Sequence, residues 1–131
     1  MKKVGVNPWN WSKALGYDQG HIVTGEARTL YCAGQTATDA EGKPRHPGDM
    51  AAQLALSLDN LEAVLKEADM SLTSIARLTL YTTDVDALFR HYGVLASRLG
   101  AAGATPPATL LGVSRLALPE LLVEVEAIAV A

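Results

Sequence analysis

The sequence predicts an α+β fold in which two helices cover one face of a β-sheet. Two segments carry apolar residues at helical spacing, and strand-like segments lie before, between and after them. Strands separated by two amphipathic helices are typical of a sandwich with both helices on one side. The last strand-like segment is apolar on both faces at most positions, which is typical of a fully buried strand.

The first strands are expected in residues 21–24 and 29–32, which are rich in β-branched and aromatic residues. The residues between them, 25–28, begin with glycine, so the two runs are predicted to pair as a hairpin. A polar loop over residues 38–44 follows and leads to the first helix.

The two helices are indicated by apolar residues at intervals of three and four, with an aspartate before each as the expected N-cap. In the first, Asp49 precedes the apolar positions Leu54, Leu58, Leu61 and Leu65. In the second, Asp84 precedes the apolar positions Val85, Leu88, Tyr92, Leu95 and Leu99. Gly100 is expected to end the second helix, because the position after a helix favours a residue that tolerates positive φ.

Three further strands are expected. Residues 75–83 alternate, with one face formed by Ala76, Leu78 and Leu80 and the other by Arg77, Thr79 and Tyr81. Residues 110–113 form a short strand, and residues 121–130 form a long one. One face of the long strand holds Leu121, Val123, Val125, Ala127 and Ala129, and the other holds Leu122, Glu124, Glu126, Ile128 and Val130.

The second face of this sheet needs a cover that the chain does not supply. Two helices can cover one face only, and no third amphipathic helix is present. The simplest cover is another copy of the same sheet, so we expect a homo-oligomer. The alternative is a one-sided sheet with scattered exposed aliphatic side chains.

Composition predicts one domain over residues 1–131 and argues against several classes of function. The 49% hydrophobic content argues against disorder, and the lone Cys32 against a disulfide scaffold. A net charge of −3 without a basic block argues against nucleic-acid binding. No apolar run approaches the roughly 18–20 residues of a membrane span. No signal-peptide-like run follows the N-terminus, so we expect a cytoplasmic protein without membrane contact.

Glu124 and Glu126 are the first candidates for chemistry. They lie two residues apart on a strand, so both project from one face, between Leu122 and Ile128. A carboxylate on an apolar face must be paired, protonated or functional, and burial would raise its pKa toward the range used in general acid–base catalysis. The alternative is a strand edge where both glutamates meet solvent or an arginine across an interface.

Other ionisable residues and the tryptophans give weaker signals. His21, His46 and His91 lack ligand-like spacing, and no glycine-rich phosphate loop is present, so no metal or cofactor is expected. Trp9 and Trp11 are the only tryptophans. They are predicted to form a pocket wall or an interface plug, or alternatively an arm that caps the core.

From about residue 16 to 130, the sequence resembles the Rid family, also called YjgF/YER057c/UK114. The resemblance rests on Gly16-Tyr17-Asp18-Gln19, Cys32-Ala33-Gly34-Gln35, Ala52-Gln53, Ser57-Leu58-Asp59-Asn60-Leu61, Pro106-Pro107-Ala108 and the closing run from Glu124 to Val130. It implies a chorismate-mutase-like mixed sheet and a homotrimer with clefts between subunits. It also implies hydrolysis of 2-enamine and 2-imine acids to 2-keto acids and ammonia. Glu124 matches the glutamate that positions water, Tyr17 a tyrosine over the cleft, and Gly34 a backbone contact.

The signature arginine of the family, which binds the substrate carboxylate, is absent. Its position falls on Ala108 or Thr109, and neither side chain reproduces bidentate recognition of a carboxylate. Losing such a pair costs on the order of 2–5 kcal/mol, unless Arg77, Arg115 or a neighbouring subunit supplies the cation.

We therefore expect a small carboxylate or imine metabolite to bind near Tyr17, Gly34, Ala108, Thr109, Trp9 and Trp11, with Glu124 as the catalytic residue if hydrolysis occurs. The enzymatic activity is expected to differ from standard imine deamination or to be absent. The alternative is a non-catalytic small-molecule-binding or interaction module. The endoribonuclease activity attributed to some family members fits poorly with a net charge of −3.

Overall fold

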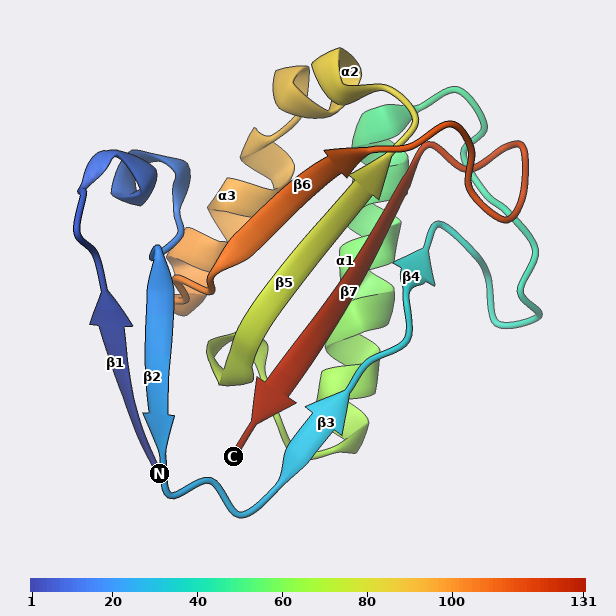
Figure 1. Ribbon diagram of the computed structural model, residues 1–131. Helices are drawn as coiled ribbons and strands as arrows, with labels where there is room; N and C mark the ends of the chain where they lie inside the picture. Colours follow the sequence, from blue (N-terminus) through green and yellow to red (C-terminus); the bar gives the residue numbers. More distant parts are fainter.

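The computed structural model describes residues 1–131 and confirms the α+β fold (Figure 1). The helices are α1 (Met50–Glu67), α2 (Val85–Arg90) and α3 (Gly93–Ala102), with short 3-10 turns at Trp11–Leu15 and Leu72–Ser74. The strands are β1 (Lys2–Val6), β2 (Gly20–Thr24), β3 (Thr29–Tyr31), β4 (Gln35–Thr36), β5 (Ile75–Thr82), β6 (Ala108–Gly112) and β7 (Val123–Val130). None of the helices is long and apolar enough to cross a membrane.

The larger sheet has five strands, with β7 near its centre. The order is β3-β7-β5-β6, and β4 pairs with β7 on the same side as β3. The β5–β6 pair is parallel, whereas β7 runs antiparallel to β3, β4 and β5, so the sheet is mixed. The parallel pair is connected through α2 and α3.

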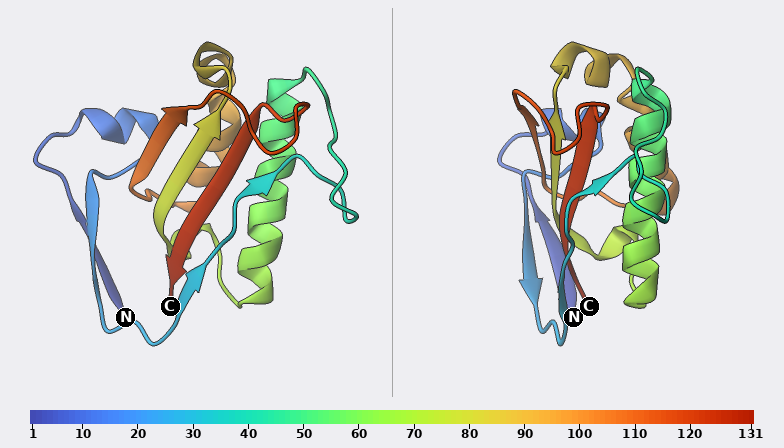
Figure 2. Two further views of the ribbon diagram at one scale, coloured as in Figure 1. Left: turned by 45° about the vertical axis from the view of Figure 1, so that its right-hand side comes forward. Right: turned by 90° about the vertical axis from the view of Figure 1, so that its right-hand side faces the viewer.

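The core lies between this sheet and the helices. α1 and α3 pack on the same side of the sheet (Figure 2). The four leucines predicted for the first helical stripe are all buried, as are the residues predicted for the inner face of the last strand: Leu121, Val123, Val125, Ala127 and Ala129. The strand itself begins at Val123, so Leu121 lies in the loop before it. Both predicted N-caps are confirmed, because Asp49 accepts a hydrogen bond from the Ala52 N–H and Asp84 from the Ala87 N–H, each at 3.0 Å.

The predicted hairpin of residues 21–24 and 29–32 is wrong. β2 pairs instead with β1, a strand that the sequence analysis did not predict, and β3 pairs with β7. The segment 25–28 carries the chain from one sheet to the other, and the N–H groups of Ala27 and Arg28 both donate to the Ala131 carbonyl at 2.9 Å. The composition of a run indicates a strand, but it does not identify the partner strand.

The predicted second helix is two helices. α2 ends at Arg90 and α3 begins at Gly93, although Leu88, Leu95 and Leu99 remain buried on one face across the break. Gly100 does not end the helix as predicted, because it lies within α3. The left-handed residue after α3 is Gly103, with φ of 68°.

The β1–β2 sheet lies beside the main sheet and is attached to it by polar contacts (Figure 1). The Lys3 ammonium donates to the carbonyls of Thr73 and Ile75, at the start of β5. Three side chains surround the Asp18 carboxylate at 2.7–2.9 Å, namely Asn7, His21 and Thr105. These contacts join the N-terminal segment to the loop that precedes β6.

Candidate functional site

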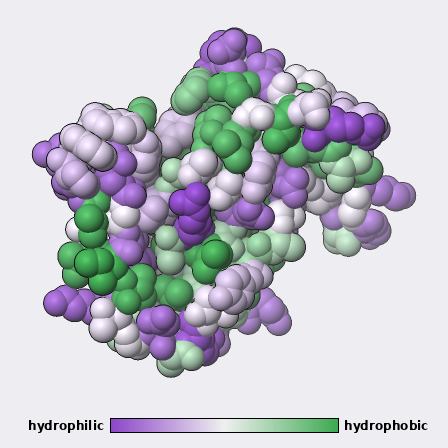
Figure 3. All heavy atoms as spheres, in the orientation of Figure 1, coloured by the Kyte–Doolittle hydropathy of each residue, from purple (hydrophilic) through white to green (hydrophobic).

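The sheet face opposite the helices, here called the open face, carries the ionisable residues of the candidate site. β7 contributes Glu124, Glu126 and Ile128, and Leu122 lies just before β7; all four are only partly buried. β5 contributes Arg77, Thr79 and Tyr81. Figure 3 shows hydrophilic and hydrophobic side chains intermingled on this face. The predicted alternation is therefore confirmed for β5 and for β7 as far as Ala129, whereas Val130, which was predicted for the open face, is buried. No helix covers this face.

The Glu124 carboxylate lies against Gly34, at the entrance to β4. A Cβ at position 34 would stand 1.9 Å from Glu124 Oε1 and 2.7 Å from its carboxyl carbon. Any other residue at position 34 would therefore displace the carboxylate. Burial raises the pKa of the Glu124 carboxyl, and the charge of Glu126 raises it further. Glu124 is thus a carboxylate of increased basicity.

Glu126 is held by Tyr81 from the neighbouring strand. The Tyr81 hydroxyl donates a hydrogen bond to Glu126 Oε1. That bond, and then burial, raise the pKa of the Tyr81 hydroxyl, so the phenol stays protonated and continues to donate. No basic side chain lies within ion-pair distance of Glu126.

Arg77 provides a guanidinium on the open face. Its Nη2 donates to Thr109 Oγ1 on β6 at 2.8 Å, which places the guanidinium above the edge strand of the sheet. Arg115 is turned away, because its side chain donates to the carbonyls of Leu116 and Ala117 in its own loop. Arg77 is therefore the cation that reaches the position where the sequence lacks one.

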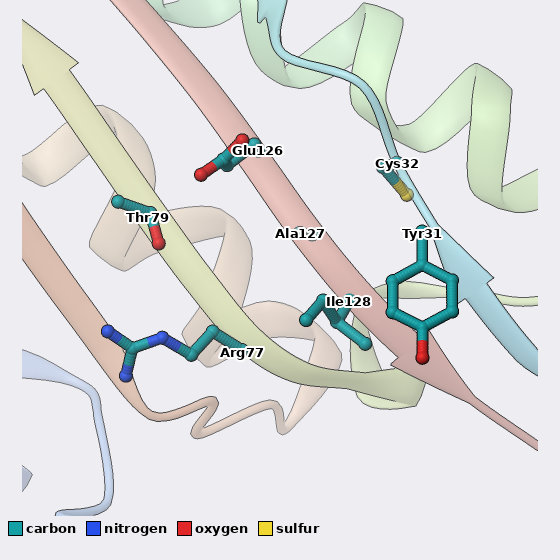
Figure 4. Close-up of a pocket in the computed structure, with 7 residues that line it drawn as sticks. All are labelled: Tyr31, Cys32, Arg77, Thr79, Glu126, Ala127 and Ile128. Carbon is teal, nitrogen blue, oxygen red and sulfur yellow. The ribbon is translucent and has the colours of Figure 1, made fainter.

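A cavity of about 320 Å³ lies on the open face between β3, β5 and β7 (Figure 4). Its lining residues are Tyr31, Cys32, Arg77, Thr79, Glu126, Ala127 and Ile128. Figure 4 shows Thr79 between Arg77 and Glu126. The cavity is thus polar at its charged ends and apolar at the side formed by Ile128 and the Tyr31 ring.

Comparison with known proteins identifies the family. A family model described as Endoribonuclease L-PSP matches residues 12–131. The chain is 32% identical to YyfB of Yersinia pestis, described as a protein of unknown function of the conserved Rid protein family; all of both chains align, with a TM-score of 0.87. The chain belongs to the Rid family. The resemblance predicted from the sequence is confirmed.

Other Rid-family relatives agree with this assignment. A RutC family protein of Pyrococcus abyssi is 31% identical over 100 residues, which are 76% of each chain. The structure of Escherichia coli TdcF with bound serine is 30% identical over 88% of this chain and 87% of that one, with a TM-score of 0.70. The YjgF gene product of Escherichia coli is 28% identical over 87% of each chain, also with a TM-score of 0.70.

The binding residues predicted for this Rid-family chain fall into two groups. Gly34 lies beside Glu124, as described above. Tyr17, Ala108 and Thr109 line a second cavity of about 120 Å³ at the other edge of the sheet. Thr109 also contacts Arg77, so it connects the second cavity with the open face.

The tryptophans line neither cavity. Trp9 is 63% exposed and Trp11 is 59% exposed. The Trp11 ring meets the Tyr17 ring edge to face, with centroids 6.0 Å apart. Trp11 therefore supports Tyr17 from outside the second cavity, and Trp9 projects from the surface.

Two contacts of the Rid-family site were missed by the sequence analysis: Tyr81 with Glu126, and Arg77 with Thr109. Each joins residues on different strands. Alternation had placed Arg77 and Tyr81 on one face of their strand, but it does not say which residues of the neighbouring strands lie opposite. The register places Tyr81 opposite Glu124 and Thr79 opposite Thr109, so both missed contacts run diagonally between strands. No group of three or more His, Cys, Asp or Glu residues is placed to hold a metal ion.

Proposed function

We propose that this Rid-family chain binds a small metabolite carrying a carboxylate and an imine in clefts formed where the open faces of three copies meet. Partly buried aliphatic residues stand beside ionisable ones on the open face, a mixture typical of an interface that also holds a polar ligand. TdcF, a relative of similar fold, holds serine, and a ligand of that size suits a cavity of about 320 Å³. Glu124 does not line this cavity itself but lies on the same face of β7, two residues from the lining residue Glu126.

The reaction that we propose is hydrolysis of the C=N bond. Water adds to the imine carbon, the C–N bond of the adduct then breaks, and the products are a 2-keto acid and ammonia. Glu124 accepts the proton of the attacking water and returns it to the departing nitrogen. The observation that carries this proposal is the Glu124 carboxylate held against Gly34, with its pKa raised by burial.

The substrate carboxylate requires a cation, and Arg77 is proposed for that role. Its guanidinium reaches Thr109 from the neighbouring strand, with most of its five N–H donors free for a ligand. The signature arginine of the family would lie on β6, at Ala108 or Thr109, whereas Arg77 lies on β5. The substrate carboxylate would therefore be held from a different direction. We therefore expect an activity that differs from standard imine deamination in rate or in substrate preference.

Ribonuclease activity, which the name of the matched family model suggests, is not proposed. RNA binding depends on neutralising backbone phosphates with clustered basic residues. The open face carries Arg77 together with two glutamates, and the chain has a net charge of −3.

The test is the hydrolysis of freshly generated 2-iminopropionate by the wild type and single variants. We expect Glu124→Gln to lower kcat by about 100-fold or more, because it removes the proton acceptor. We expect Arg77→Gln to raise KM by about 30-fold or more, because it removes a charge-assisted pair. The control is Glu120→Gln, which removes an exposed carboxylate from the loop before β7 and should leave both constants unchanged.

Two results would contradict the proposal. If Glu124→Gln hydrolysed the imine as fast as the wild type, Glu124 would not be the proton acceptor. If the wild type were inert and 2-iminopropionate or its keto-acid product did not raise the Tm, the alternative of a non-catalytic interaction module would replace this proposal.

A further inference from the structure

Glu124 and Glu126 project from the same face of β7 but turn toward opposite neighbouring strands. The Glu124 carboxylate lies against Gly34, on the side where β4 pairs with β7. The Glu126 side chain points toward β5, as Figure 4 shows, and accepts the hydrogen bond of the Tyr81 hydroxyl. Side chains two residues apart on a strand start out on the same face, so contacts with the neighbouring strands draw these two carboxylates apart.

The contact between Tyr81 and Glu126 runs diagonally across the strand pair. In the register of β5 and β7, Tyr81 stands opposite Glu124, and Thr79 stands opposite Glu126. The tyrosine therefore begins beside one glutamate and ends at the carboxylate of the other. Of the two carboxylates, only that of Glu126 accepts a hydrogen bond from the chain.

Building on the proposed function, we infer that Tyr81 gives the two glutamates different roles. Tyr81 is a positioning residue that holds Glu126 on the β5 side as a fixed negative charge, and Glu124 is left as the one that exchanges a proton with the ligand. Two carboxylates that meet at one site share a proton and titrate as a pair. Holding Glu126 aside prevents this sharing, while its charge still favours protonation of Glu124.

The electrostatics of the open face support these roles. Burial raises the pKa of the Glu124 carboxyl, and the charge of Glu126 raises it further. The hydrogen bond to Glu126, and then burial, raise the pKa of the Tyr81 hydroxyl, so the phenol keeps the proton that it donates. The other titratable groups beside Glu126 line the same cavity and form no hydrogen bond to either glutamate: Tyr31, Cys32 and Arg77.

The first test is titration of Glu124, followed by NMR of isotope-labelled glutamate carboxyls. We expect Glu126→Gln to lower the pKa of Glu124 by about 0.5 or more, because it removes a neighbouring negative charge. Tyr81→Phe should raise that pKa, because it keeps the ring but releases Glu126 to approach Glu124. The matched control is Tyr92→Phe, which removes a hydroxyl that donates to the Leu15 carbonyl and should leave the pKa of Glu124 unchanged.

The second test is hydrolysis of 2-iminopropionate by a double variant. Once released by Tyr81→Phe, Glu126 is free to accept the proton that Glu124 no longer takes. We therefore expect Tyr81→Phe combined with Glu124→Gln to be at least about tenfold faster than Glu124→Gln alone. A tyrosine needed only for packing would lower the rate in both backgrounds.

A pKa of Glu124 that fell or stayed unchanged in Tyr81→Phe would overturn the inference. In an active enzyme, a double variant no faster than Glu124→Gln would overturn it as well. The titration does not depend on turnover. Opposite shifts in Glu126→Gln and Tyr81→Phe, in a protein inert toward 2-iminopropionate, would therefore uphold the positions assigned to the two glutamates while the proposed hydrolysis failed.

Discussion

Asp18 shows how one carboxylate can tie distant segments of this chain together. Burial raises the pKa of the Asp18 carboxyl, but hydrogen bonds from Thr105, Asn7 and His21 outweigh that effect and lower it overall. A carboxyl whose pKa is lower in the folded state than in the unfolded state stabilises the fold only when ionised. Its contribution is therefore complete above the unfolded value of about 3.9 and is lost as the pH falls through the lower folded value.

We expect Asp18→Asn to reduce the free energy of unfolding at pH 7 by on the order of 2–3 kcal/mol, because charged acceptors form the stronger hydrogen bonds. The difference from the wild type should shrink when denaturation by urea is repeated near pH 3. The control is Glu41→Gln, which changes an exposed carboxyl in the loop before α1. A difference that stayed constant between pH 7 and pH 3 would show that ionisation of Asp18 is not the cause.

At the scale of single residues, the sequence predicted faces better than contacts. The alternation in the last strand placed Glu124 and Glu126 on one face, and the structure agrees. The resemblance supplied Gly34, whose contact with Glu124 no periodicity could indicate, because the two are 90 positions apart. The contacts of Tyr81 and Arg77 depend on the register between strands, and one strand's pattern carries no information on register.

At the scale of elements, Gly100 within α3 and Gly103 just after it have opposite roles. Gly100 lies within the helix, where glycine is less favourable than alanine by about 0.5–1 kcal/mol. Gly103 ends the helix in the left-handed conformation, with φ of 68°, which costs other residues about 1–2 kcal/mol. A Cβ at either position would meet no atom within 4 Å, so only backbone conformation distinguishes them.

We therefore expect Gly100→Ala to raise the free energy of unfolding by about 0.5–1 kcal/mol and Gly103→Ala to lower it by about 1 kcal/mol. Denaturation by urea under identical conditions measures both, and each variant serves as the control for the other. Changes of the same sign would contradict the position assigned here to the end of α3.

A buried apolar face made α1 predictable, whereas β1, which lacks one, was missed. The leucine period of α1 reflects burial against the sheet and so predicts the helix. β1 escaped prediction because Val4 and Val6 remain exposed, and the strand has no apolar face to indicate it. The break between α2 and α3 was missed for a related reason, since the buried stripe continues through it.

At the scale of the whole molecule, the open face leads to a prediction about assembly. We expect the wild type to have the mass of a trimer in solution by light scattering. Ile128→Asp should shift the mass toward that of the monomer, because it places a charge among the aliphatic residues of the open face. The control is Ala63→Glu, which adds a charge to the exposed side of α1.

A wild-type monomer would contradict both the assembly and the shared cleft. The uncovered face itself was predictable. A strand that is apolar on both faces must be covered on both, and the two predicted helices cover only one face of the sheet. The number of copies was not, since the apolar pattern of one strand does not specify a symmetry.

The central place of β7 also determines when the site can exist during folding. β7 follows every strand that it pairs with, so β3, β4 and β5 lack their shared neighbour until it inserts. Pairing of this kind joins residues distant in sequence and slows folding, and it leaves strand edges unpaired in the meantime. Because Glu124 and Glu126 lie on that strand, the pairing of β7 also brings both carboxylates to the sheet. A chain in which β7 has not yet paired therefore has neither carboxylate in place.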